Sequence, residues 1–366
     1  MNVERLHRIL IDLDAEIDEK NFHGILANVQ AHLQNQVNAP QDPNHQKKLV
    51  QSLNNLGDTL INSSYNDYSP SWKQIISEIG GENLFGGELK QKIDEIFARN
   101  QITPANALEE IKHINTAFTT FQSHIKQAVD SFEGLNIGTE ELEKGQCEFG
   151  YTIPRDFVEN KLTSFEEEIH ELNFILNSLS EAITGKKQDY EVKTISSSDF
   201  LLYIIIGLQV ADILSKATER ILSIYKQILE IKKLRNELKE KGVPATQTKG
   251  IETHANSLME KEIKKISKEI IDENYEGDNG RRNELQNAVT FALNKLANRI
   301  DNGFNVEIRI NALPEPEETE EEEVELSKED IEKYEKVKTI IERSKNIENI
   351  KSGGKSILKL PEGKKK

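Results

Sequence analysis

The sequence predicts a mainly α-helical protein of long helices with coiled-coil-like ladders, whose second unit adds a small three-stranded sheet (α+β). Three observations lead to this fold class. Apolar residues recur at steps of three and four along most of the chain. Only three short stretches show the alternating spacing of strands. The 366 residues also exceed the roughly 250–300 that one hydrophobic core organises, which predicts at least two packed units.

Residues 1–134 are expected to form a helical domain. A short helix is expected from Ser71 to Gly80, after longer helices predicted by apolar ladders at 3–17, 22–33 and 49–60. Thr103 and Pro104 have the residue types of an N-cap and a first helical position. The helix that they begin is expected to end at Gly134, because glycine favours helix termination.

A small sheet is expected in the second unit, residues 146–310. Side chains alternate with a period of two at 149–153, 190–195 and 304–310. Because short strands are unstable alone, the three are expected to pair in one sheet. This pairing would bring the two ends of the unit together.

Long helices are expected between these strands. One apolar ladder covers 158–183 and ends at Gly185. A second helix is expected to begin at the "SSSD" sequence and to run to Lys241, so that the very apolar stretch 200–214 would form its first turns. Those turns would be buried by the sheet and neighbouring helices, whereas the remainder would project as half of a hairpin or coiled coil. Further helices are expected at 247–275 and 281–302.

Three segments follow the second unit: an acidic linker at 313–326, an amphipathic helix at 327–350 and a basic tail at 351–366. The linker contains eight glutamates and has almost nothing apolar to bury, so it is expected to be extended or disordered. Ser327 and Asp330 form a capping box that would begin the helix.

The C-terminal segments are expected to bind a protein partner. The helix would offer one apolar stripe and the tail a short apolar peptide, while nearby lysines would steer the tail toward an acidic surface. The alternative is a solvated tail that only maintains solubility. The candidate partner-binding residues are Ile331, Tyr334, Val337, Ile341, Ile357, Leu358 and Leu360.

The composition restricts the class of protein. A net charge of −16 makes nucleic acid an unexpected partner. The single cysteine, Cys147, excludes an intramolecular disulfide and favours a reducing compartment. Acidic residues interrupt the N-terminal stretch 1–18, so no secretory signal is expected and the location is expected to be cytoplasmic. The apolar stretch 200–208 is too short for a stable membrane span, which needs about 20 residues.

No catalytic, cofactor-binding or metal-binding set of residues is recognisable in the sequence. The string "SGGKS" at 352–356 lacks the first glycine of a phosphate loop and the strand that should precede it. None of the eight histidines has a second histidine at zinc-binding spacing. Cys147 has no neighbouring base and is expected to be a partly buried, unreactive thiol.

One segment, "LQVADILSK" at 208–216, resembles the helix segment of the chemotaxis response-regulator phosphatases. In that family an Asp and a Gln four residues apart lie on a helical bundle, and the amide positions the attacking water. Asp212 matches the acid, but Lys216 stands at the amide position. The resemblance therefore does not extend to the activity, and an ordinary surface pair between Asp212 and Lys216 is expected.

The leading hypothesis is a cytosolic helical interaction or scaffold protein without catalytic activity, whose long helices would also allow a homo-oligomer. One alternative is a helical-bundle phosphoryl-transfer or hydrolytic enzyme using Asp212, which would then have to lie at an accessible cleft. Another is a helical pore-forming protein whose stretch 200–214 would have to be releasable.

Two polar features near residue 290 have no assigned role. Arg281 and Arg282 stand at a helix start, where cations oppose the helix dipole, and ion pairs with the acidic body are the expected explanation. On the same helix, Asn294, Asn298 and Asp301 form a polar face that predicts no reaction.

Overall fold

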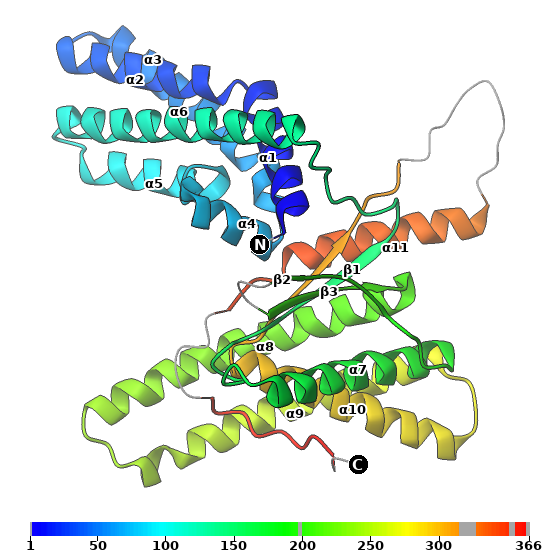
Figure 1. Cartoon of the computed structure of the whole chain (residues 1–366). Coiled ribbons are helices and arrows are strands. Elements are labelled where there is room, and N and C mark those ends of the chain that lie inside the picture. The colour runs from blue at the N-terminus through cyan, green and yellow to red at the C-terminus, as the bar shows by residue number, and fades with distance from the viewer. Residues whose placement is uncertain (1, 197–199, 315–326, 351–355, 364–366) are drawn as a thin grey trace. The chain divides into compact units, whose positions relative to one another are not determined.

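The structure is a computed structural model that describes residues 2–196, 200–314, 327–350 and 356–363. The chain divides into two compact units, Met1–Glu141 and Leu142–Lys366 (Figure 1). Each unit has a hydrophobic core of its own, as expected for a chain longer than one core can organise.

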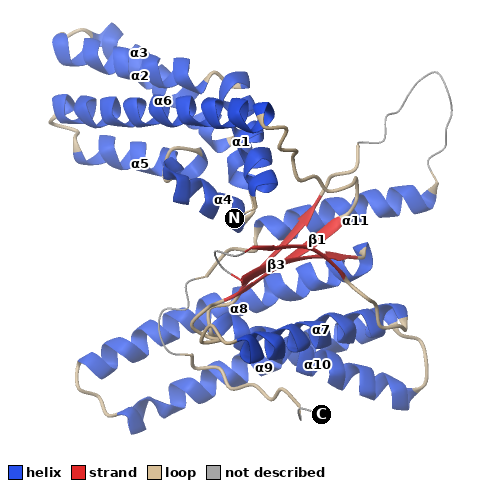
Figure 2. Ribbon diagram, viewed as in Figure 1, coloured by secondary structure: helices blue, strands red, loops and turns tan. Residues whose placement is uncertain are grey.

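Helices make up the N-terminal unit (Figure 2). Helix α2 packs against both α3 and α6, and α1 packs against α6, so the apolar ladders face one another. The elements are α1 (Val3–Glu19), α2 (Phe22–Asn38), α3 (Pro43–Ile61), η1 (Ser64–Asp67), α4 (Pro70–Ile76), η2 (Ser77–Gly81), α5 (Gly86–Arg99) and α6 (Pro104–Gly134).

Three local features of this unit differ from the sequence prediction. The short helix expected from Ser71 begins at Pro70 and passes into a π-helical turn. The Thr103 hydroxyl does not cap α6 and instead donates to Asn100 Oδ1 at 3.0 Å. Helix α5 was not predicted, because it follows the Gly80-Gly81 pair and itself begins with Gly86 and Gly87, residues that favour turns.

The second unit contains a four-stranded antiparallel sheet in the order β2-β3-β1-β4. Its strands are β1 (Cys147–Ile153), β2 (Glu191–Ser196), β3 (Phe200–Ile206) and β4 (Asn305–Ile310). Phe149 on β1 stands opposite Ile204 on β3 and Ile308 on β4, so apolar side chains line up across one face. The expectation of three strands was wrong by one, because β3 was predicted to be helix.

The stretch 200–206 is a central strand, not the beginning of a helix. Its run of aromatic and β-branched residues favours a strand that is buried between two neighbours, β2 and β1. Gly207 separates this strand from the helix that follows. Burial of the stretch is confirmed, since Leu202, Ile204 and Ile206 are all less than 5 % exposed.

A layer of long helices covers the sheet (Figures 1 and 2). It comprises α7 (Leu162–Thr184), α8 (Leu208–Glu240), α9 (Ala245–Asn274) and α10 (Asn279–Asp301). Helix α8 packs on β1, β4 and α9, while α10 packs on α7 and α9. As predicted, α7 ends at Gly185, which adopts the left-handed conformation at φ +73°.

Two C-terminal elements complete the second unit. Helix α11 (Lys328–Lys345) begins at Ser327, whose hydroxyl accepts a hydrogen bond from the Asp330 N–H and thereby confirms the predicted cap. This helix packs against α8 and β4. Residues 356–363 are extended, and we call them the tail segment. The predicted acidic linker lies almost wholly outside the described residues, as do 351–355 and 364–366 of the basic tail.

Candidate functional site

The tail segment lies on the helical layer of the second unit, and Figure 1 shows it in red beside α9. Ile357, Leu358 and Leu360 are at most 4 % exposed and belong to the main core of the unit. Lys359 and Pro361 are exposed. The buried and exposed positions therefore alternate from Leu358 to Pro361, as in a strand that lies on an apolar surface.

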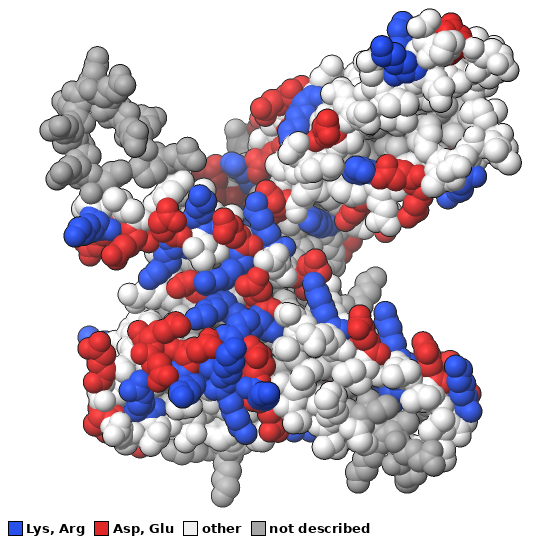
Figure 3. Space-filling view, turned by 180° about the vertical axis from the view of Figure 1, so that it is seen from behind, with Lys and Arg blue, Asp and Glu red and all other residues white. Residues whose placement is uncertain are grey.

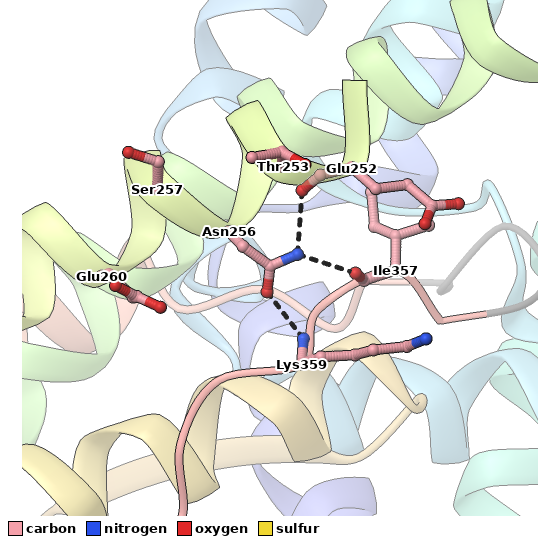
Figure 4. Close-up of a pocket in the computed structure, with 7 residues that line it drawn as sticks. All are labelled: Glu252, Thr253, Asn256, Ser257, Glu260, Ile357 and Lys359. Atoms are coloured by element: carbon pink, nitrogen blue, oxygen red, sulfur yellow. Dashed lines mark hydrogen bonds between the residues drawn. The ribbon is translucent and has the colours of Figure 1, made fainter. Parts of the chain in front are cut away.

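Two asparagines from different helices bind the main chain of the tail segment. Asn256 of α9 donates from Nδ2 to the Ile357 carbonyl at 3.1 Å and accepts the Lys359 N–H at 2.7 Å (Figure 4). Asn298 of α10 donates to the Leu360 carbonyl at 3.0 Å and accepts the N–H of the same residue at 3.1 Å. Each side-chain amide thus satisfies one backbone donor and one backbone acceptor of the tail segment.

Asp301, the last residue of α10, binds the beginning of the tail segment. Its side chain is fully buried, and Oδ2 accepts the N–H groups of Ile357 at 2.5 Å and Leu358 at 2.7 Å. The other oxygen accepts the Tyr225 hydroxyl at 2.8 Å and the Lys232 ammonium at 3.2 Å, both from α8. A buried carboxylate is stable only with such partners, so the tail segment supplies part of what Asp301 requires.

Burial, followed by the negative charge of Asp301, raises the pKa of Tyr225 well above its ordinary value. Tyr225 therefore stays protonated and remains a hydrogen-bond donor to the carboxylate at physiological pH. The cluster of Tyr225, Lys232 and Asp301 consequently presents a fixed acceptor to the two backbone N–H groups.

The end of the tail segment carries an acid that two cations bind. Glu362 accepts hydrogen bonds from Arg299 at 2.8 Å and from Asn298 at 2.7 Å, and Lys295 lies 3.6 Å from its second oxygen. Burial alone would raise the pKa of the Glu362 carboxyl, but these hydrogen bonds and charges outweigh it and hold that pKa below its ordinary value.

The two cations are themselves held by α7. Arg299 pairs with Glu168 at 3.1 Å, and Lys295 pairs with Glu171 at 2.5 Å. Both cationic side chains are less than 10 % exposed. Because these pairs fix the two cations, the acid of the tail segment meets two preorganised hydrogen-bond donors.

An open hollow of about 440 Å³ borders the tail segment (Figure 4). It is lined by Glu252, Thr253, Asn256, Ser257, Glu260, Ile357 and Lys359. The two glutamates make this side of α9 favourable for a basic side chain such as Lys359.

We call the set of Asn256, Asn294, Asn298, Arg299 and Asp301 the tail site.

The predicted partner-binding residues do not form one exposed surface. Ile357, Leu358, Leu360 and Val337 are buried in the core of the second unit, and Tyr334 and Ile341 are half-buried. Only Ile331, at 46 %, is clearly exposed. The described tail segment does not offer its short apolar peptide to a partner, because its apolar side chains bury themselves against the chain's own helices.

Asp212 takes part in a structural contact. Its carboxylate accepts a hydrogen bond from Arg343 of α11 at 2.6 Å. The expected pair with Lys216 is absent, since Lys216 binds Glu273 on α9 at 3.0 Å. Asp212 is also not among the residues that line the described hollow. Asp212 keeps 28 % of its side chain exposed. The enzyme alternative, which requires Asp212 at an accessible cleft, stays a prediction.

Other candidates from the sequence have structural partners. Arg281 binds Glu181 and Glu284, and Arg282 binds Asp272 at 2.8 Å, so the expected ion pairs are confirmed. Burial raises the pKa of the Cys147 thiol to about 12, which leaves it protonated. Within the described ranges, no group of three potential metal-ligating side chains gathers in one place.

The described residues show whether a helix could span a membrane and how charged side chains are distributed. Among the described residues, no helix combines the length and the apolarity that crossing a bilayer requires. Figure 3 shows positive and negative side chains interspersed over one face of the second unit. Ion pairs also join α8 to α9, such as Arg220 with Glu262 at 2.5 Å.

Part of the tail site was recognised in the sequence, but no function was assigned to it. Asn294, Asn298 and Asp301 were recognised as one polar face of α10, and their spacing of four and three residues was the available signal. Asn256 was missed, because a single asparagine in an amphipathic helix is an ordinary surface residue.

Compared with known proteins, the chain matches no family model, no curated protein and no solved structure.

Proposed function

We propose that the second unit is a protein-interaction module that binds an extended peptide, and that the tail segment occupies this site in cis. The observation that carries the proposal is main-chain recognition: side chains of α9 and α10 accept the N–H groups of four consecutive residues, 357–360. Main-chain hydrogen bonds give affinity for any extended segment, while pockets for alternate side chains give specificity.

The burial of the tail segment supports the same function. Three apolar side chains enter the core, and Glu362 meets Arg299 and Lys295. Side chains from two helices bind four backbone N–H groups of this segment, so its recognition depends largely on the main chain. The module would act without catalysis, as the leading hypothesis expects.

The test is exchange of the tail segment in the full chain. A protease recognition sequence would replace residues 351–355, so that the tail is cut after folding and stays bound only by its contacts. A fluorescent peptide of sequence SILKLPEG, residues 356–363, should then bind saturably as the severed segment leaves, and fluorescence anisotropy would measure this. A peptide that never enters, although the cut chain remains folded, would contradict the proposal.

A matched pair of variants on α10 sharpens this test. Asn298→Leu keeps the side-chain size but removes the bonds to the Leu360 main chain and to Glu362, and should weaken peptide binding about 10- to 30-fold. Asn287→Leu changes an exposed asparagine of the same helix and should leave binding unchanged. Equal affinities of the two variants would show that the amide does not bind the peptide.

A cytoplasmic scaffold is the broader role that we propose for this module. In it, α8 and α9 would also contact a second copy as a coiled coil, and the 53 % exposure of Leu234 on α8 favours such a contact. Sedimentation velocity over a range of concentrations would test this self-association, and Leu234→Glu should abolish it. A strictly monomeric wild-type protein would exclude it.

A further inference from the structure

Asn294 occupies the tail site without using all of its hydrogen-bonding capacity. It precedes Asn298 by one helical turn and donates from Nδ2 to the Pro361 carbonyl at 2.7 Å. The residue is 3 % exposed, yet its Oδ1 is buried and has no hydrogen-bond partner within the described part of the chain. Its two counterparts, Asn256 and Asn298, use both amide atoms on the tail segment.

The residue opposite Asn294, Pro361, explains why Asn294 Oδ1 has no hydrogen-bond donor. Asn298 binds the carbonyl and the N–H of one residue, Leu360. The same arrangement at Asn294 would require the N–H of residue 361, but that residue is proline and has none. A buried acceptor without a donor is destabilising, so the tail segment does not satisfy this site fully.

We infer that the tail segment is a replaceable ligand, and that the site's full ligand is a segment of another protein with a residue other than proline at this position. This inference rests on the proposed function. The remaining contacts define the rest of the segment: apolar residues at the positions of Ile357, Leu358 and Leu360, any residue at the exposed position 359, and an acid at the position of Glu362. Such a segment would keep every contact of the tail and add one hydrogen bond to Asn294.

The charged residues of the site favour a ligand segment of another protein that carries an acid over an arbitrary apolar strand. Arg299 and Lys295 pair with Glu168 and Glu171 of α7, so residues outside the tail fix the positions of both cations. Their position selects ligands that place an acid two residues after the last buried apolar side chain. The tail occupies the site until a ligand with the additional N–H displaces it.

The test compares three peptides on the severed full-length chain: SILKLPEG, the same peptide with alanine for proline, and the same peptide with N-methylalanine for proline. Alanine restores the N–H, whereas N-methylalanine removes it without adding a ring. The alanine peptide should bind about fivefold more tightly than the N-methylalanine peptide. Equal affinities of these two peptides would overturn the inference while leaving the proposed function intact, whereas no binding by any of the three would overturn the proposed function itself.

Two variants assign the effect to Asn294. In Asn294→Leu the alanine and N-methylalanine peptides should bind equally, because no acceptor remains for the N–H. In Asn298→Leu all three peptides should weaken by the same factor. A difference between alanine and N-methylalanine that persists in Asn294→Leu would contradict the assignment.

A second measurement avoids cutting the chain. Pro361→Ala in the intact protein should slow amide hydrogen exchange at Leu358 and Leu360 about fivefold, because the tail then satisfies Asn294. Faster or unchanged exchange would count against the inference. If the wild-type protein instead forms dimers that disappear when the tail is deleted, the site's ligand is the tail of a second copy, and the inference of a different partner protein is wrong.

Discussion

Asp301 shows at the residue scale how one buried carboxylate connects the helical layer to the tail segment. One oxygen binds Tyr225 and Lys232, and the other binds two backbone N–H groups. Because the group is fully buried, its stability depends on all of these partners together. Removing the charge would leave the Lys232 ammonium buried without its carboxylate.

Asp301→Asn is therefore expected to lower the free energy of unfolding of the second unit by about 3 kcal/mol. The control is Asp272→Asn, which removes a half-exposed partner of Arg282 and should cost less than about 1 kcal/mol. Urea denaturation followed by circular dichroism measures both. Equal losses of unfolding free energy in the two variants would mean that the Asp301 carboxylate contributes no more than a half-exposed ion pair.

Glu362 gives the tail contact a pH dependence. When the tail is bound, the pKa of the Glu362 carboxyl lies below the ordinary value of 4.5. Protonation of this carboxylate is therefore harder in the bound tail than in the free tail. The stabilisation from Glu362 is thus fully present above about pH 4.5 and is lost as the pH falls through the lowered pKa. Affinity of SILKLPEG for the severed chain should decrease below pH 4.5, and the peptide with glutamine for Glu362 should show a flatter profile in anisotropy titrations. Parallel profiles of the two peptides would exclude this role of the carboxylate.

Strand β3 decides the architecture at the element scale. An apolar run of seven residues is compatible with a buried helix or a buried strand, and periodicity alone does not separate the two. Pairing with β2 on one side and β1 on the other satisfies its backbone groups. In a strand, adjacent residues face opposite sides, so Ile204 enters the core, where it is 4 % exposed, whereas Ile205 is only half-buried.

This alternation makes a matched pair of substitutions informative. Ile204→Asp should destabilise the second unit by at least about 4 kcal/mol, because it buries a carboxylate in the main core without a partner. Ile205→Asp should cost clearly less, because its side chain lies on the other face and retains access to water. Thermal unfolding of the two variants compares them directly. A greater loss for Ile205→Asp would contradict the observed register.

The whole molecule consists of two units with separate cores, and the C-terminal elements belong to the second. The C-terminal region contributes six buried apolar side chains: Val337 and Ile340 of α11, Ile347 after this helix, and Ile357, Leu358 and Leu360 of the tail segment. Each such side chain contributes about 1.5–3 kcal/mol when fully buried. The C-terminal region is therefore part of the fold of the second unit as well as the occupant of its candidate site.

Deletion of residues 313–366 should consequently lower the melting temperature of the second unit by more than about 10 °C, at roughly 2–4 °C per kcal/mol. The transition of the N-terminal unit should stay unchanged, because its core shares no residue with the deleted region. Differential scanning calorimetry separates the two transitions. An unchanged second transition would support the solvated tail that was the alternative from sequence alone.

Local sequence signals determined much of the secondary structure of this protein. Gly185 ends α7, Ser327 begins α11, and three of the strands follow from side-chain alternation, because each of these features depends on residues close together in the chain. The tertiary structure alone decided that 200–206 is a strand, since strand pairing satisfies backbone groups through residues far away in sequence. It also decided the tail site: Asn256, Asn298 and Asp301 are ordinary polar residues until the tail segment, more than fifty residues later, brings its backbone donors to them. The free energy of that contact belongs to pairs of distant residues, and no window of sequence contains both members.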